Sequence, residues 1–258
     1  MKNYLFWITV FLYLVSGGWV KADNWTLSVG GGAIVHETPW KDMPVQYAVL
    51  PYIDAEYGRW HFGMQSGIFQ YRLSDEQWPV ALSAGLDYRD EGYDSMFNFN
   101  DDLSDDPVFD GYHAPDGEVA ARLDMNWQHL SATVSQDVSD KSKGTSASLI
   151  YMYPVYQGNR GVQVKLGGGF RWLSDKYADY LYGINGDNIN PAQGRFAYQA
   201  DAATNYQASV QLIYPFAAQW AVNAQLTHER LDDSIKQSPL VDVTSTTQFM
   251  LFVTYRKF

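Results

Sequence analysis

The chain has 258 residues, 46% of them hydrophobic and 16% aromatic, and it carries 29 acidic against 18 basic side chains. The excess of acid repels phosphates and disfavours a nucleic-acid partner, and the absence of cysteine excludes disulfides and thiolate metal sites. A mean hydropathy of −0.30 excludes a helical membrane protein, whereas the aromatic excess is typical of a surface in a membrane interface.

The first 22 residues have the pattern of a secretory signal peptide. Lys2 precedes an apolar stretch over residues 4–15, small residues follow at 16–18, and cleavage is expected after Ala22. An uncleaved anchor helix is the alternative, but the apolar run is short and ends in glycines. Removal of Lys2 and Lys21 leaves 16 basic and 29 acidic residues, a net charge of −13. We therefore expect an exported single domain at residues 23–258.

The rest of the chain alternates between apolar and polar residues with the period of a β-strand, and no segment keeps helical spacing over three turns. In chain order, the alternating segments are 25–35, 45–57, 60–71, 80–89, 118–127, 130–136, 146–155, 162–172, 205–214, 220–229 and 247–258. A further short strand is expected at 176–184. The sequence therefore predicts an all-β protein.

Alternation alone fits both a soluble β-sandwich and a transmembrane antiparallel β-barrel. Three features favour the barrel. The segments have about the ten residues that a tilted strand needs to cross a bilayer, charges occur on the second face, and aromatic residues bound the apolar rows as membrane girdles do. These aromatic residues are Trp25, Tyr57, Trp60, Tyr88, Trp127, Trp172, Tyr206, Tyr214, Trp220 and Tyr255.

The eleven segments and the short strand give about twelve strands, with ten as the alternative. An even number returns both termini to the periplasm, as in single-chain bacterial barrels. With this numbering, however, the long stretch 90–117 falls on the periplasmic side, where turns are normally short. Without the strand at 176–184 the count is odd, so the side that carries 90–117 stays open.

The polar rows define one group of candidate site residues. Charges of both signs fall on these rows and are expected to face the lumen: Asp54, Glu56, Asp87, Arg89, Arg122, Asp124, Lys165 and Arg171. They could pair with one another and fill a small barrel, or they could line a narrow pore. A selective pore usually carries a ring of one sign, so the mixture favours an occluded interior.

The stretch 90–118 holds ten acidic residues and no lysine or arginine. Its cluster at 98–106 has enough oxygen ligands for calcium, but it lacks the glycine at position six and the closing glutamate of a calcium loop. A solvated acidic loop is the simpler interpretation. Weak binding of a divalent cation, or capture of a protein, is the alternative.

Short motifs near both ends resemble the MipA/OmpV family of outer-membrane barrels. Residues 36–42, HETPWKD, are followed by a proline, and the last eighty residues contain YLYGI at 180–184, ERLDD at 229–233 and SPLV at 238–241. The matching positions are Pro39, Trp40, Pro51, Tyr182, Gly183, Arg230, Leu231, Ser238, Pro239, Val241, Tyr255 and Phe258. Two departures are Lys236-Gln237 before Ser-Pro and an ending stretched to Tyr255-Arg-Lys-Phe258. The resemblance is weak between about 72 and 145.

The resemblance implies a barrel in the outer membrane of a Gram-negative bacterium, surrounded by lipid and lipopolysaccharide. A member of that family is named for binding the murein transglycosylase MltA and links it to a peptidoglycan synthase, so a non-enzymatic scaffold is implied. A small diffusion channel or adaptive surface protein is the alternative. No cofactor or metal is expected, and the five histidines lack metalloprotease spacing. His228 falls on the apolar row, which points it away from any pocket.

Overall fold

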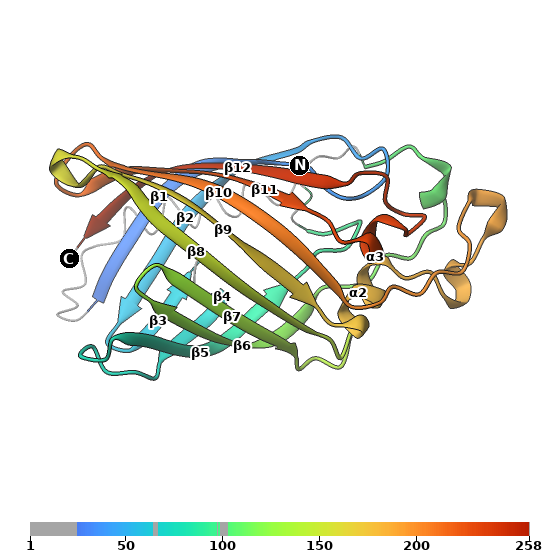
Figure 1. Cartoon of the computed structure of the whole chain (residues 1–258), viewed down its shortest axis with the longest axis horizontal. Coiled ribbons are helices and arrows are strands. Elements are labelled where there is room, and N and C mark those ends of the chain that lie inside the picture. Colours follow the sequence, from blue (N-terminus) through green and yellow to red (C-terminus); the bar gives the residue numbers. More distant parts are fainter. Residues whose placement is uncertain (1–24, 64–66, 97, 99–102, 258) are drawn as a thin grey trace, which may run out of the picture.

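The computed structural model describes residues 25–63, 67–96, 98 and 103–257, so the expected signal peptide at residues 1–22 lies outside the described residues. The described chain forms twelve antiparallel strands in a closed barrel (Figure 1). The strands are β1 (Trp25–His36), β2 (Gln46–Tyr57), β3 (Trp60–Gly63), β4 (Gly67–Arg72), β5 (Val80–Arg89), β6 (Glu118–Trp127), β7 (Leu130–Asp137), β8 (Thr145–Gln157), β9 (Gln163–Leu173), β10 (Ala203–Pro215), β11 (Trp220–Arg230) and β12 (Ser245–Lys257).

Helices occur only in the connections between these strands, as far as the chain is described. They are α2 (Asp175–Tyr182), α3 (Asp233–Lys236) and the 3-10 helices η1 (Pro107–Phe109), η2 (Asn159–Gly161), η3 (Gly186–Asn188) and η4 (Pro191–Gln193). Within the described ranges, no helix has the length and apolar character needed to cross a bilayer.

The predicted count of twelve strands is confirmed, but two of the predicted elements are wrong. Residues 175–182 form helix α2 rather than a strand. The segment 60–71 is a hairpin of two strands, because the chain reverses between Gly63 and Gly67, which pair with each other. Both glycines have positive φ, a conformation open to glycine at little cost. The two errors cancel in the count.

The same correction settles the side of the long acidic stretch. With β3 and β4 as separate strands, the described residues of 90–117 lie at the same end as the connections 37–45, 138–144, 174–202 and 231–244 (Figure 1). The opposite end carries both ends of the described chain and the shorter turns, of which the longest is 73–79. Short turns are periplasmic and long loops extracellular in outer-membrane barrels. We therefore assign the long-loop end to the cell exterior.

Burial follows the two faces of the strands. The apolar row of β6 is solvent-accessible at Leu123, whereas Asp124 and Ala120 on the alternate row are buried. This is the inverse of a soluble protein, and it is what a barrel in lipid requires. At Gly32 the neighbouring backbone approaches too closely for a side chain, since a Cβ there would lie 2.1 Å from the carbonyl oxygen of Leu251.

Candidate functional site

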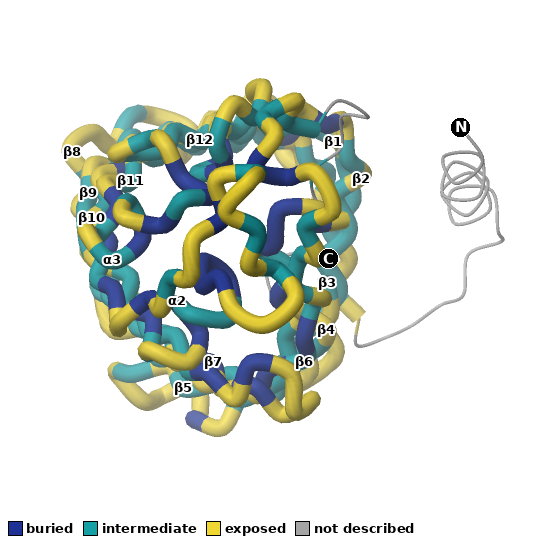
Figure 2. Tube along the Cα trace, turned by 90° about the vertical axis from the view of Figure 1, so that its right-hand side faces the viewer, coloured by how far each residue is buried: buried dark blue, intermediate teal, exposed yellow. Residues whose placement is uncertain are grey.

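The long-loop end carries a folded cap, which we define as the connections 37–45, 174–202 and 231–244 and the described residues of 90–117. These connections carry most of the buried apolar side chains of the described chain, and they pack as one cluster. Figure 2, which faces this end, shows α2 lying within the ring of strands. The apolar core of this protein therefore lies in the barrel mouth.

Helix α2 forms here because its sequence supplies both a cap and an apolar face. The Ser174 side chain accepts a hydrogen bond from the backbone N–H of Tyr177, which satisfies a donor that the first helical turn leaves free. Tyr177, Ala178, Leu181 and Tyr182 recur at helical spacing and are buried. The helix ends at Gly183, where a Cβ would lie 2.3 Å from an Asp179 carboxylate oxygen.

Motif positions from opposite ends of the sequence, such as Trp40 and Val241, meet in the cap. The Trp40 and Tyr182 rings pack with centroids 5.2 Å apart, and Trp40 forms an isolated β-bridge with Val241. The Ser238 hydroxyl donates a hydrogen bond of 2.7 Å to the carbonyl of Tyr182. Trp40, Tyr182, Ser238, Val241 and Leu231 are all buried. These residues hold the loops together, which is a structural role.

The other motif positions are dispersed. Pro39 precedes the bridge at Trp40, Gly183 ends α2, and Pro239 follows Ser238 in the cap. Arg230 is exposed at the end of β11, and Pro51 lies within β2. The Tyr255 ring lies 5.1 Å from that of Trp220 at the periplasmic end. Phe258 lies outside the described residues, so the pairing of the stretched ending is described only as far as Lys257, which pairs with Leu27.

A charged cluster anchors α2 to the barrel wall. Both Glu91 carboxylate oxygens accept hydrogen bonds of 2.6 Å from Arg171 on β9, and the Tyr177 hydroxyl donates to Glu91 at 3.2 Å. The Arg89 guanidinium lies 4.1 Å from the centroid of the Tyr177 ring, a cation–π geometry, and it also pairs with the buried Glu118. The inner wall and the cap are therefore joined both by the Arg171–Glu91 ion pair and through the Tyr177 side chain.

This cluster shifts the acidity of the groups that lie in the cap. Burial alone would raise the pKa of Glu91, but the charge and hydrogen bonds of Arg171 outweigh it, so the pKa of Glu91 is lowered. Burial and the neighbouring Glu91 carboxylate raise the pKa of Tyr177 far above its usual value. Glu91 is thus an anion and Tyr177 a neutral hydrogen-bond donor at neutral pH.

The sequence-predicted lumen charges fall into separate groups. Arg122 donates to Asp124 at 2.8 Å and to Asp87 at 3.3 Å. The Thr133 hydroxyl adds a hydrogen bond of 2.6 Å to Asp124. These partners lie on β5, β6 and β7 and bridge one sector of the inner wall. Arg89 and Arg171 belong instead to the cluster beneath α2.

The remaining three predicted residues are less constrained. Glu56 lies 3.8 Å from both His61 and Arg256, and Asp54 shares its row on β2. Lys165 has no ion-pair partner among the described residues. Sequence reasoning missed Glu91 and Tyr177, which lie in loop and helix. Glu118 shares the inward row with Arg122 and Asp124, so parity could have identified it.

The acidic stretch is part of the cap rather than a free loop, as far as it is described. Asp106 caps η1 and pairs with Lys41 at 3.1 Å. The hydrogen bond from the Val108 N–H is the largest of the influences that lower the pKa of Asp106. The buried Arg195 guanidinium donates at 2.9 Å to the carbonyl of Asp110. Asp101 and Asp102 lie outside the described residues, so cation binding stays a prediction.

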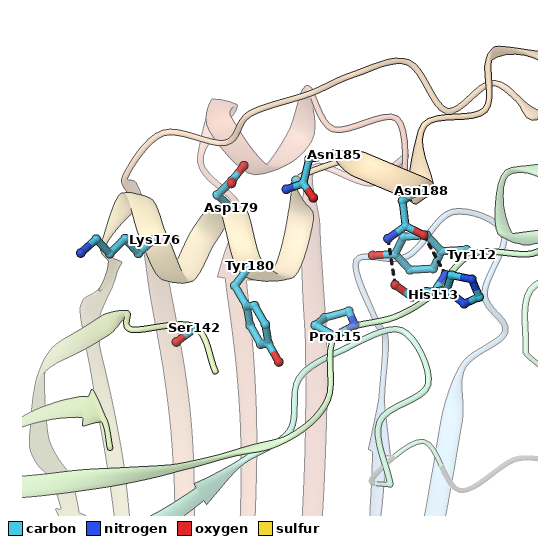
Figure 3. Close-up of a pocket in the computed structure, with 10 residues that line it drawn as sticks. Tyr112, His113, Pro115, Ser142, Lys176, Asp179, Tyr180, Asn185 and Asn188 are labelled. Atoms are coloured by element: carbon cyan, nitrogen blue, oxygen red, sulfur yellow. Dashed lines mark hydrogen bonds between the residues drawn. The ribbon is translucent and has the colours of Figure 1, made fainter. Parts of the chain in front are cut away.

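A hollow of about 360 Å³ lies between α2 and the loop 112–115 (Figure 3). Asn188 holds that loop through two hydrogen bonds of 2.9 Å with the backbone of His113, and the Tyr180 hydroxyl donates to the carbonyl of Asp116 at 2.9 Å. Lys176 and Asp179 line the same hollow. The polar groups are used mainly to fasten the cap.

Comparison with known proteins assigns the family. The model of the family described as MltA-interacting protein MipA matches residues 23–257. The chain is 24% identical to "MltA-interacting protein" of Escherichia coli (strain K12), covering 95% of each chain. It is 23% identical to "Putative outer membrane protein YiaT" of the same strain, covering 89% of this chain and 90% of that one.

Among solved structures, OprB of Pseudomonas putida matches with a TM-score of 0.38 and 11% identity, covering 97% of each chain. The NanC porin matches with a TM-score of 0.37 and 10% identity, covering 90% of this chain and all of that one. With the family model spanning nearly all of the barrel and cap, the chain belongs to the MipA family of outer-membrane β-barrels.

Proposed function

We propose that this barrel is a non-enzymatic scaffold that holds a murein transglycosylase, and through it a peptidoglycan synthase, at the inner face of the outer membrane. The name of the E. coli relative, MltA-interacting protein, supports a transglycosylase as the partner. The carrying observation is the packed mouth: the cap forms one buried apolar cluster at the extracellular end, and charges on one sector of the inner wall pair with one another. Such an interior favours a rigid scaffold over a solute path.

The partner binds at the periplasmic end in this proposal, because murein lies on that side of the outer membrane. The turn 73–79 is the longest connection there, and contacts with neighbouring residues hold it. The Ser74 hydroxyl accepts a hydrogen bond of 3.0 Å from the N–H of Leu82, and the Asp75 carboxylate pairs with Arg59. A turn held in one conformation loses little entropy when a partner binds.

Trp78 is the side chain on this turn best suited to anchor a partner. Its exposed fraction is 58%. Val80 pairs with Trp127 at the strand end, so Trp78 lies beyond that aromatic girdle toward the periplasm. Exposed tryptophans are common anchors of protein interfaces.

A pull-down from envelope extract, developed on a renaturing gel that contains murein, tests the proposal. We expect a murein-degrading band with the wild-type barrel and a strongly reduced one with Trp78→Ser. Trp127→Ser, on the girdle of the same end, is the matched control and should retain the band. Absence of any lytic band with the wild type would contradict the scaffold, and equal capture by Trp78→Ser would place the partner elsewhere.

A further inference from the structure

The barrel wall has a gap on one side, where the strands β3 and β4 are much shorter than their neighbours β2 and β5. Strand β2 pairs with β3 only from Asp54 to Tyr57, and β5 pairs with β4 only from Ser83 to Leu86. Among the described residues, positions 47–52 of β2 therefore face no strand on that side. Beyond the ends of β3 and β4, the backbones of β2 and β5 are separated by three interstrand spacings. At about 4.8 Å each, these give a gap of roughly 14 Å.

The free edge of β2 is adapted to the lack of a partner. The carbonyl oxygen of Ile53 points to β3, where a Cβ on Gly63 would lie 2.3 Å from it, whereas that of Leu50 points to β1 and Gly31. Odd-numbered residues of β2 therefore direct their backbone groups toward the opening. Pro51 is one of them, and it has no N–H to leave unpaired. Proline within sheets is confined to such edges.

The opening lies at the height of the membrane. Tyr57, which stacks on Trp25 with ring centroids 4.9 Å apart, marks the periplasmic girdle. Ten residues of a strand tilted by about 40° rise roughly 25 Å, the height of the apolar band, so Tyr47 lies near its outer border. Val49, between them, has an exposed fraction of 84%, against 50% for Leu123 on β6. Val49 is more exposed because β3 ends before it reaches this part of β2.

The inner wall on the β2 side of the opening is apolar at positions 48–52, whereas the β5 side belongs to the charged sector that contains Asp87. Leu50 and Tyr52 of β2 lie on the row that alternates with Val49, and Tyr52 packs on Phe252 of β12 with ring centroids 5.9 Å apart. Ile34 and Met250 pair with each other on the inward rows of β1 and β12. Gly32 pairs with Leu50, and the Phe252 ring covers it, since a Cβ there would lie 2.5 Å from that ring.

We propose that one acyl chain of an outer-leaflet lipid enters the barrel through the opening between β2 and β5 and lies against this apolar sector. The sector is continuous with the lipid-facing surface, so lipid is the molecule that reaches it without crossing water. An acyl chain that packs against apolar side chains needs no hydrogen bonds. The strand edge at Pro51 offers few hydrogen-bonding groups. A strand from a second copy would instead need the N–H that Pro51 lacks.

Fluorescence quenching by lipid tests the site, and the lack of native cysteine makes each single-thiol label unambiguous. The reporter is bimane on Leu50→Cys, in vesicles whose phospholipids carry bromine in mid-chain. Val49→Cys is the lipid-facing reference. Gln211→Cys on β10, which faces inward on the far side of the barrel, is the matched lumen control.

We expect the fractional loss of fluorescence at Leu50→Cys to approach that at Val49→Cys, with little loss at Gln211→Cys. Tyr52→Cys repeats the test if Leu50→Cys fails the heat-modifiability check of folding. Quenching at Leu50→Cys as weak as at Gln211→Cys overturns the proposal, and so does equal strong quenching at both. A water-soluble brominated short-chain acid in plain vesicles should have little effect; quenching by that acid alone overturns the membrane lipid as the source.

Discussion

The barrel wall and its cap bury their residues by opposite rules. On the wall, Leu123 and Leu166 face outward and are about half exposed, while Asp124 is buried. In the cap, Trp40 and Leu181 are buried, while Asp233 and Asp187 lie at the surface. The wall is an apolar shell around a polar interior, whereas the cap is organised like a small water-soluble domain.

The difference shows which interactions each region depends on. Apart from the free edge of β2 at positions 47–52, wall strands satisfy their backbone through the closed ladder, and lipid accepts their apolar rows. The cap has few ladder hydrogen bonds and depends on side-chain packing and on specific contacts such as Ser238 to Tyr182. Substitutions should therefore damage one region and spare the other.

The largest effect is expected from Trp40→Ala. Removal of a buried tryptophan leaves a cavity and costs about 3 to 5 kcal/mol, here borne by the cap. Hydrogen exchange should rise in 174–202 and 231–244 while the strands stay protected and the barrel stays heat-modifiable. Trp127→Ala, half exposed on the wall, should leave cap exchange unchanged. Loss of the whole barrel in Trp40→Ala would show that cap and wall do not fold separately.

The next effect concerns the wall. Leu123→Arg or Leu166→Arg should cost about 2 to 4 kcal/mol near mid-membrane, because a guanidinium must then enter hydrocarbon. Asn126→Arg and Gln163→Arg, on the alternate rows, should be mild. Refolding into vesicles at graded urea measures each variant. Equal losses in both sets would mean that the inward and outward faces are misassigned.

A smaller effect is expected from acid. The folded-state pKa of Glu91 lies below its unfolded value, so its contribution is present above the ordinary glutamate pKa of about 4.3 and is lost as pH falls through the folded value. Cap hydrogen exchange in Glu91→Gln should exceed that of the wild type at pH 6, and the two should converge in strong acid. A difference that persists unchanged in acid would contradict the role of the Arg171 pair.

Sequence patterns predicted the wall well because alternation is a local property of each strand. The inward and outward rows of β6 and β9 could be assigned directly from the sequence. The family resemblance identified the motif positions that lie in the cap, but not the contacts between them. The helix α2 was missed although Ser174 and the spacing of Tyr177, Ala178, Leu181 and Tyr182 indicated it. The hairpin of β3 and β4 was also indicated by sequence, because glycines at 63 and 67 are typical of a turn. Contacts such as Trp40 with Tyr182 depend on long-range packing, which no local pattern reports.

The central claim is that the paired interior and the cap leave no steady solute path, and conductance in planar bilayers tests it most directly. We expect purified wild-type protein to give little or no steady current. Disruption of the inner charges in Arg122→Glu, or a new charge in Lys165→Glu, should not convert it into a well-behaved channel. Stable single-channel steps from the wild type, altered in size or selectivity by either substitution, would contradict the account and favour the diffusion channel.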